Sequence, residues 1–355
     1  MSFAPRDDTR KKQQPQQQRL AVSADGATSV DVELCPATHR SRVVKRTLTT
    51  HSRAVAHNAL KELDVLLALQ GKTPHVVQLL EYRLDGPYLL VAQELCERGD
   101  LFDVLRLEAK TSNSSGGCNV DGLTTSEPAL RRTFRQIVRG VAELHHVGFA
   151  HMDLSLENVL VRRNGDVCLT DFGAAQRFNR DARGKIVPQV LPHGGVAKPA
   201  YAAPEQHVEA AAFDVTKADA WALGVLLWML VTRTPLVQSA TSDDALFRRM
   251  QSRGAWWALE STRRLRHASW ELRDLLHRLL DPSPASRLSV DSALQHPWLR
   301  SSPPSLSSSS SSSSKASKEP SPKPWTRLRS RSSGSRVEIS LEATRVPIAI
   351  SSSHA

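Results

Sequence analysis

The stretch VLVRRNGDVCLTDFG, residues 159–173, constrains the fold of this chain more than any other. Two short apolar runs flank Asn164 and Gly165, and an Asn-Gly pair between such runs is a strong signal for a β-hairpin turn. Asn158 comes directly before the first run, and Asp171 follows the second. The predicted hairpin therefore brings Asn158 and Asp171 close together.

Asp153, in the preceding segment HMDLSLEN, adds a second carboxylate to this pair. Oxygen ligands of this kind suit Mg²⁺, which proteins usually bind through one or two carboxylates together with substrate phosphates. Phosphoryl transfer also needs a group that positions the acceptor hydroxyl and a cation on the phosphates, because catalysis there is mostly positioning and charge stabilisation. The cluster of Asp153, Asn158 and Asp171 is therefore compatible with magnesium-dependent phosphoryl transfer.

Length and composition suit one large globular domain, or two lobes, with tails: the chain has 355 residues and 40% hydrophobic content. Its four cysteines are far apart in sequence and form no CxxC pair, so neither a zinc site nor a disulfide framework is predicted. The longest apolar run, residues 221–231, is too short to cross a bilayer, and no signal peptide is recognisable. We expect a soluble protein in the cytoplasm, with the nucleus as the alternative.

Much of the net charge of +11 lies in the two ends of the chain. Residues 1–20 are basic and rich in glutamine, and residues 300–355 are basic and rich in serine, with an unbroken run at Ser307–Ser314. Such segments cannot bury enough apolar surface to offset their ordering entropy, so both are predicted to be disordered. Nucleic-acid binding is not expected for the region between them and stays open for the tail.

Between these tails, a series of motifs resembles, in order, the eukaryotic protein kinase family. The stretches that carry the resemblance are VVKR with Lys45, KELDVLLAL with Glu62, YLLVAQELCERGDLFDVL (88–105), HMDLSLEN, the DFG of 171–173, the APE of 203–205, KADAWALGVLL with Asp219, and PASRLSVDSALQHPWL with Arg287. An ordered series is far more specific than DFG alone. The resemblance covers residues 21–299 and implies an α+β, two-lobed fold, with a β-rich N-lobe at about 21–95 and a helical C-lobe at about 96–299.

The same resemblance implies a site for ATP and Mg²⁺. Asp153 would orient the acceptor hydroxyl and accept its proton, Asn158 and Asp171 would hold the metal, and Lys45, fixed by Glu62, would balance phosphate charge. The implied nucleotide contacts are Gly26 and Val30 at the phosphate loop, Gln93 at the gate of the pocket, backbone groups of Glu94 and Cys96 at adenine, Asp100 near the ribose, and Leu160 under the base. Arg287 would pair with Glu205.

The phosphate loop departs from the family pattern. It reads SADGATSV, residues 23–30, and keeps only Gly26 of three glycines that let backbone N–H groups approach phosphates. Asp25 would add negative charge beside ATP. This departure supports an alternative function, a pseudokinase that binds nucleotide weakly and acts as a scaffold. Because Lys45, Asp153, Asn158 and Asp171 are all retained, we favour an active protein kinase.

A second departure lies in HMDLSLEN, residues 151–158, which resembles the family's catalytic loop. Ser155 stands there in place of the family's lysine. Aligning KPAYAAPE on the family's loop puts Lys198 at the place of a threonine. One interpretation is that hydroxyl and ammonium have exchanged positions, so that Lys198 joins the catalytic residues. The alternative is that Lys198 points into solvent and Ser155 only fills a small space. Ser155 leaves the choice between Ser/Thr and Tyr acceptors open, although the loop lacks the alanine-arginine pattern of tyrosine kinases, which favours Ser/Thr. A small-molecule kinase is a weaker third reading, because the helices after the APE motif resemble protein-substrate platforms.

Regulation and substrate preference also follow from the resemblance. From Asp171 to Glu205 the sequence holds no Ser or Thr, and Met152 occupies the place of the arginine that would bind an activating phosphate. We expect no activation by phosphorylation of this segment. Asp100 and Glu157 lie where a basic residue before the acceptor would dock, so the expected partner is a protein substrate with such residues. We expect the chain to be a monomer.

Overall fold

The computed structural model describes residues 18–114, 123–191 and 198–300, and all of them belong to one compact unit. The serine-rich tail at 301–355 and residues 1–17 lie outside the described residues, so their predicted disorder stays a prediction. Strand β1 begins at Gln18, slightly before the expected domain boundary at residue 21.

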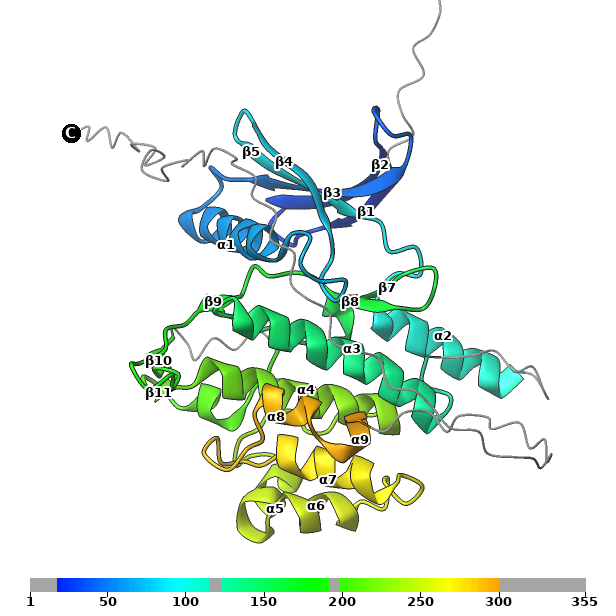
Figure 1. Cartoon of the computed structure of the whole chain (residues 1–355), viewed down its shortest axis with the longest axis vertical. Helices are drawn as coiled ribbons and strands as arrows, with labels where there is room; N and C mark the ends of the chain where they lie inside the picture. The colour runs from blue at the N-terminus through cyan, green and yellow to red at the C-terminus, as the bar shows by residue number, and fades with distance from the viewer. Residues whose placement is uncertain (1–17, 115–122, 192–197, 301–355) are drawn as a thin grey trace, which may run out of the picture. The chain divides into compact units, whose positions relative to one another are not determined.

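A five-stranded antiparallel sheet forms the small lobe, in the order β1-β2-β3-β5-β4 (Figure 1). Its strands are β1 (Gln18–Val22), β2 (Thr28–Leu34), β3 (Ser41–Leu48), β4 (Leu79–Asp85) and β5 (Tyr88–Glu94). The stretch VVKR lies within β3 and YLLVAQE makes up β5, where β-branched and other apolar side chains fit the pleated surface. Helix α1 (Arg53–Leu69) connects β3 to β4 and is capped by the Ser52 hydroxyl.

The large lobe is mostly helical. Its helices are α2 (Leu101–Ser114), α3 (Glu127–His146), α4 (Val215–Thr232), α5 (Ala245–Arg253), α6 (Ala255–Ser261), α7 (Trp270–Leu279), α8 (Val290–Leu294) and α9 (Pro297–Arg300). Its short strands are β6 (Phe149–Ala150), β7 (Val159–Val161), β8 (Val167–Leu169), β9 (Gln176–Arg177), β10 (Gln189–Val190) and β11 (Ala212–Phe213), with 3-10 turns η1 (Leu156–Asn158) and η3 (Pro204–His207). The expected two-lobed α+β fold is thereby confirmed.

Two elements flank the catalytic loop, and one of them is the predicted hairpin. Helix α3 buries one face, on which lie Leu130, Phe134, Ile137, Val141 and Leu144 at helical spacing. Strands β7 and β8 pair as an antiparallel hairpin with Val159 opposite Leu169. Gly165 in its turn has a φ of +83°, a left-handed conformation that glycine adopts at low cost.

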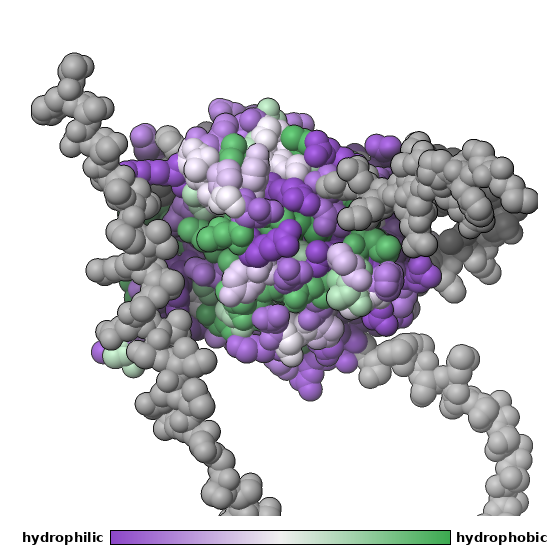
Figure 2. Space-filling model, turned by 90° about the horizontal axis from the view of Figure 1, so that it is seen from above, coloured by the Kyte–Doolittle hydropathy of each residue, from purple (hydrophilic) through white to green (hydrophobic). Residues whose placement is uncertain are grey.

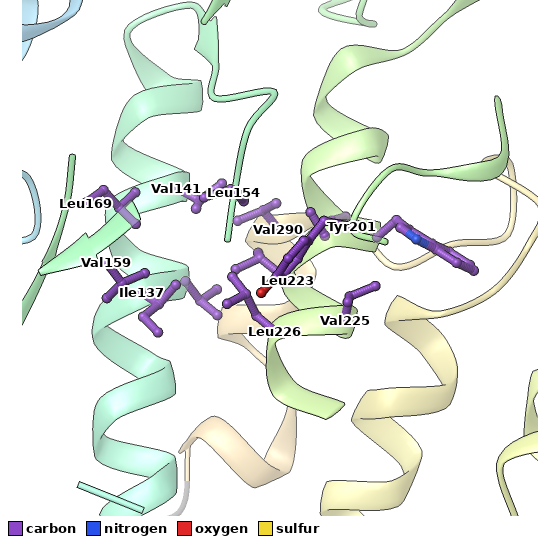
Figure 3. Close-up of a cluster of buried hydrophobic side chains, with 14 of the residues drawn as sticks. Ile137, Val141, Leu154, Val159, Leu169, Tyr201, Leu223, Val225, Leu226 and Val290 are labelled. Atoms are coloured by element: carbon purple, nitrogen blue, oxygen red, sulfur yellow. The ribbon is translucent and has the colours of Figure 1, made fainter. Parts of the chain in front are cut away.

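The core of the large lobe lies between α3, the β7–β8 hairpin and α4 (Figure 3). Side chains of Ile137 and Val141 meet Leu223 and Leu226 of α4 beneath the catalytic loop, and Leu154 from that loop packs into the same cluster. Such close packing fixes the backbone on which the loop is built.

Helix α4 extends the apolar run 221–231 in both directions, so by length and composition it is, unlike that run, long enough to cross a membrane; however, 72% of its apolar window is buried within the protein. A helix that is apolar on all sides and covered by other elements is a core helix. Figure 2 shows the molecule from above, and on this face hydrophobic residues lie among hydrophilic ones. Exposed apolar side chains of the small lobe include Leu20 and Val22 on edge strand β1 and Leu80, Tyr82 and Leu84 on edge strand β4.

Candidate active site

Lys45 links the two lobes through two carboxylates. It lies in the middle of β3, opposite Val30 in β2 and Val91 in β5. Its Nζ is 2.6 Å from Glu62 Oε2 on α1 and 3.2 Å from Asp171 Oδ1. Asp171 lies two residues after the end of β8. The structure therefore brings together the three residues that the sequence separates by 17 and 126 positions.

Electrostatics within this triad favour the charged forms. Burial would lower the pKa of Lys45, but Glu62 and Asp171 outweigh it and hold the pKa well above its usual range. The Lys45 ammonium in turn lowers the pKa of Asp171, whose side chain is half-exposed. Both groups are consequently charged at neutral pH. Lys45 is then a cation that can bind phosphates, and Asp171 is an anion that can bind a metal ion.

The buried side chain of Asp219 on α4 holds the catalytic loop by hydrogen bonds. Its two carboxylate oxygens accept hydrogen bonds from the backbone N–H groups of His151 (2.7 Å) and Met152 (2.9 Å), and Oδ2 also lies 2.8 Å from Nε2 of His145. Met152 has a φ of +65°, a conformation costly for a side chain with a Cβ. The bonds to Asp219 hold this strained turn in place and so orient the next residue, Asp153.

Asp153 has one bonded and one unbonded carboxylate oxygen. Oδ2 accepts from Nδ2 of Asn158 at 3.0 Å and lies 3.3 Å from the Lys198 ammonium. Oδ1 is buried and has no hydrogen-bond partner within the described residues. A buried carboxylate oxygen left unpaired is costly unless a ligand completes it. Among the described residues the Asn158 side chain bonds only through Nδ2, which donates to the Asp153 carbonyl as well, and its Oδ1 has no partner there.

Lys198 and Ser155 meet as the expected exchange requires. The ammonium of Lys198 donates to the Ser155 hydroxyl at 2.7 Å, and Ser155 is fully buried. Lys198 begins the segment that leads into the APE residues, 203–205. Its contacts place a cation beside Asp153 although the catalytic loop itself contains none.

The expected adenine residues line the junction between the lobes. Gln93 is buried, and its Nε2 has no partner among the described residues. Glu94 N–H already donates to the Gln78 carbonyl, so its carbonyl is what remains for a base. Cys96 N–H makes no hydrogen bond in the described part of the chain. Asp100 forms a backbone bridge with Leu160, which brings the expected ribose and floor residues side by side.

The phosphate loop is a tight turn built around Asp25. Its Oδ1 accepts from Ala27 N–H at 3.0 Å and from the Ser23 hydroxyl at 2.5 Å, and its Oδ2 is 3.6 Å from Nε2 of His51. These bonds, led by that from Ser23, lower the pKa of Asp25. Gly26, with a φ of +69°, makes the left-handed step of the turn. Asp25 also lines a cavity of about 290 Å³ together with Lys45 and Asp171, where the phosphates are expected.

The segment after DFG is held by backbone pairing and by ion pairs. Strand β9 pairs with β6, and β10 pairs with β11. Arg287 makes a bidentate pair with Glu205, at 2.6 and 2.9 Å, with its guanidinium fully buried. The expected Arg287–Glu205 pair is therefore present and fixes the end of the segment.

Two contacts at the hinge, the segment between the end of β5 and the start of α2 that joins the two lobes, were not predicted. The carboxylate of Glu94 is bound by Arg162 of the hairpin at 2.6 and 2.9 Å, which fastens the hinge to β7. Cys96 and Cys168, taken as unrelated because of their separation in sequence, have sulfur atoms 3.7 Å apart. With Glu94 they form a compact trio of possible metal ligands, but that carboxylate is already occupied by Arg162. Cys168 lies opposite Leu160 in the hairpin, and no sequence spacing signals that Cys96 approaches it.

Comparison with known proteins agrees with this geometry. Residues 25–299 match the family model described as a protein kinase domain. The chain belongs to the protein kinase family. It is 33% identical over 248 residues to CBL-interacting protein kinase 22 of Oryza sativa subsp. japonica, a match that covers 70% of this chain and 50% of the rice protein.

Two further family members come from a yeast and a mammal. Serine/threonine-protein kinase CHK1 of Saccharomyces cerevisiae is 28% identical over 238 residues, which is 66% of this chain and 41% of the yeast protein. Testis-specific serine/threonine-protein kinase 2 of Mus musculus is 28% identical over 249 residues, which is 70% of this chain and 62% of the mouse protein. The chain thus spans about half the length of these relatives, and nothing in their names supports the pseudokinase alternative.

Proposed function

We propose that this protein kinase transfers the γ-phosphate of ATP to serine or threonine hydroxyls of protein substrates. The observation that carries the proposal is the unpaired, buried Oδ1 of Asp153, on a carboxylate whose other oxygen is held by Asn158 and Lys198. An acceptor hydroxyl would supply the missing donor. Geometry of this kind is what a general base requires.

The residues present fit ATP and Mg²⁺. Asp171 offers a half-exposed, ionised carboxylate and Asn158 an uncommitted amide oxygen, which are ligand types that Mg²⁺ accepts. Bound there, the metal would neutralise charge on the phosphates. Lys45 would pair with the α- and β-phosphates from its position opposite Val30, and Gln93, the Glu94 carbonyl and the Cys96 N–H would meet the adenine edge above Leu160.

In the proposed reaction the acceptor oxygen attacks the γ-phosphorus. A new P–O bond forms, the bond from the γ-phosphorus to the bridging oxygen breaks, and ADP leaves with that oxygen. The hydroxyl proton passes to Asp153 Oδ1. Lys198, hydrogen-bonded to Ser155, would stabilise the negative charge on the transferring group, which in such transition states is spread over its outer oxygens.

Substrate preference follows from the acids around the site. Glu157 is exposed on η1, and Asp100 directly precedes α2, where its Oδ1 accepts a hydrogen bond from Asp103 N–H at 2.8 Å. Carboxylates can bind arginine through two parallel hydrogen bonds. We propose that substrates carry arginine shortly before the acceptor residue.

A peptide assay tests the proposal. The whole chain is incubated with Mg²⁺, γ-labelled ATP and three otherwise identical arginine-containing peptides whose acceptor is Ser, Thr or Tyr. Label on Ser and Thr peptides alone is expected. Label on the Tyr peptide would overturn the acceptor assignment. Tight ATP binding without label on any peptide would favour the pseudokinase alternative that the glycine-poor loop suggested.

A further inference from the structure

Two buried cysteines meet where the hinge crosses the β7–β8 hairpin. Cys96 lies in the hinge and is 6% exposed, and Cys168 lies in the middle of β8 and is 1% exposed. Their sulfur atoms are 3.7 Å apart, and the proposed transfer reaction uses neither thiol. A disulfide joins its sulfur atoms at about 2.05 Å, so these two need to approach by about 1.7 Å to be bonded.

Hydrogen bonds on both sides of Cys96 hold the hinge against the hairpin that carries the second cysteine. Before Cys96, the carboxylate of Glu94 is bound by Arg162, directly after β7. After Cys96, Arg98 N–H donates to the Val161 carbonyl at 3.1 Å. The approach of the two thiols is therefore fixed by contacts that flank the hinge cysteine.

Strand β8 is held more firmly than the hinge. Cys168 pairs with Leu160 in the hairpin. On the other side of β8, Leu169 N–H donates to the His75 carbonyl and Val77 N–H donates to the Leu169 carbonyl, each at 2.9 Å. The backbone N–H of the hinge cysteine, by contrast, makes no hydrogen bond within the described residues. The shift that closes the gap between the sulfur atoms would therefore fall mainly on the hinge.

We propose that Cys96 and Cys168 form a redox switch, in which an oxidant of the peroxide class joins them in a disulfide that weakens ATP binding. The effect on ATP rests on the proposed function, in which the Cys96 N–H meets the adenine edge above Leu160. Leu160 and Cys168 are opposite each other in the hairpin, so their side chains lie on the same face. A shift of the hinge toward β8 moves the adenine donor and so lowers the affinity for ATP.

The oxidation takes two steps. Hydrogen peroxide first converts the thiol of Cys96, the more exposed of the two, to a sulfenic acid and releases water. The Cys168 sulfur then attacks the sulfenic sulfur, so that an S–S bond forms, the S–O bond breaks, and the leaving hydroxide takes the Cys168 proton as a second water. Two thiols thereby lose two electrons to the peroxide. The contact with Cys96 and burial raise the pKa of Cys168, so its thiolate is scarce and we expect the second step to be slow.

Peptide mapping of the full chain tests the site. The reduced chain is treated with a small molar excess of hydrogen peroxide, its remaining thiols are blocked with iodoacetamide, and it is digested with trypsin without reductant. Cleavage after Lys and Arg leaves each cysteine on a different peptide, with Cys96 on 84–98 and Cys168 on 164–177. We expect one disulfide, between these two peptides, that dithiothreitol reverses. No such link, or a link from either peptide to another cysteine, would overturn the proposal.

Isothermal titration with ATP measures the consequence, with each protein compared in its oxidised and reduced forms. Oxidation should lower the ATP affinity of the unmodified chain about tenfold or more, as expected when a well-placed hydrogen-bond donor is displaced, and dithiothreitol should restore it. Cys168→Ser and Cys168→Ala should both lose this sensitivity, and the use of two substitutions guards against misfolding. The matched control, Cys35→Ser at the partly exposed cysteine after β2, should keep it.

Two results would contradict the switch. One is an ATP affinity that stays the same although the disulfide has formed, and the other is an equal fall in the Cys168 variants. No ATP binding by the reduced chain would contradict the proposed function and with it the effect on ATP, whereas the peptide map would still decide whether the two cysteines pair.

Discussion

Lys198 supplies the cation that the catalytic loop lacks, since its ammonium contacts both Ser155 and Asp153. We predict that Lys198→Ala lowers kcat by roughly 100-fold, the size expected for losing one charge-stabilising donor, with little change in ATP affinity. Steady-state kinetics at saturating ATP measure this. Lys185→Ala, at an exposed lysine of the same segment, is the matched control and should keep its activity.

The exchange itself can be tested by reversing it. Restoring a lysine in the loop through Ser155→Lys together with Lys198→Thr should recover part of the activity that Lys198→Ala loses. Undiminished kcat in Lys198→Ala would show that this lysine has no role in transfer, whatever its contacts.

Asp25 combines a structural role with an unfavourable charge. Its carboxylate bonds to Ala27 N–H and Ser23 shape the turn, yet it faces the cavity that also contains Lys45. Asp25→Asn keeps an oxygen acceptor and removes the charge, so ATP binding should tighten by about fivefold at low salt and by less at high salt. Isothermal titration at two ionic strengths checks this, and an affinity that does not change would mean that Asp25 is screened from the phosphates.

At the scale of elements, the segment between DFG and APE is fastened without a phosphate. Pairing of β9 with β6 and of β10 with β11 anchors the part of the segment that the structure describes, and the Arg287–Glu205 pair fixes its end. We predict that phosphatase treatment, verified by mass spectrometry, changes the activity of the chain by less than about twofold. A loss of most activity would show that phosphorylation elsewhere is required.

Helix α7 carries a buried histidine that should make stability depend on pH. Burial lowers the pKa of His277 to about 4, and its ring packs on Trp256. The unfolded chain titrates near 6.5, so it binds the proton first as pH falls, and stability should decline from about pH 6.5 toward pH 4. We expect a loss of about 1–3 kcal/mol across this window.

Urea unfolding at pH 7 and pH 5 measures this effect. His277→Asn should flatten the dependence, whereas His267→Asn, at an exposed histidine between α6 and α7, should not. Identical pH profiles for the His277→Asn variant and the unmodified chain would assign the acid sensitivity to other groups.

At the scale of the whole molecule, both lobes could be predicted from the sequence, because the local secondary-structure signals and the order of the kinase motifs indicate the same fold. The apolar face of α3 and the Asn-Gly hairpin specify their elements locally, and they carry the catalytic loop between them. The pairing of Lys45 with Glu62 and the contact of Lys198 with Ser155 could be expected only from the family resemblance, since no local rule joins such distant residues.

Other features required the fold itself. The clamp of Arg162 on Glu94 and the approach of Cys96 to Cys168 depend on how the hinge crosses β7, which residue spacing does not encode.

The most direct test of the central claim compares the full chain with its Asp153→Asn variant. Transfer of label from γ-labelled ATP to a serine peptide is followed in the presence of Mg²⁺, and ATP binding by both proteins is measured in parallel. We predict transfer by the unmodified chain and a fall of at least about 100-fold in the variant, because the proton of the acceptor hydroxyl loses its base, with ATP affinity unchanged. Equal transfer by both proteins, or none by the unmodified chain despite bound ATP, would contradict the assignment of Asp153 and of phosphoryl transfer to this site.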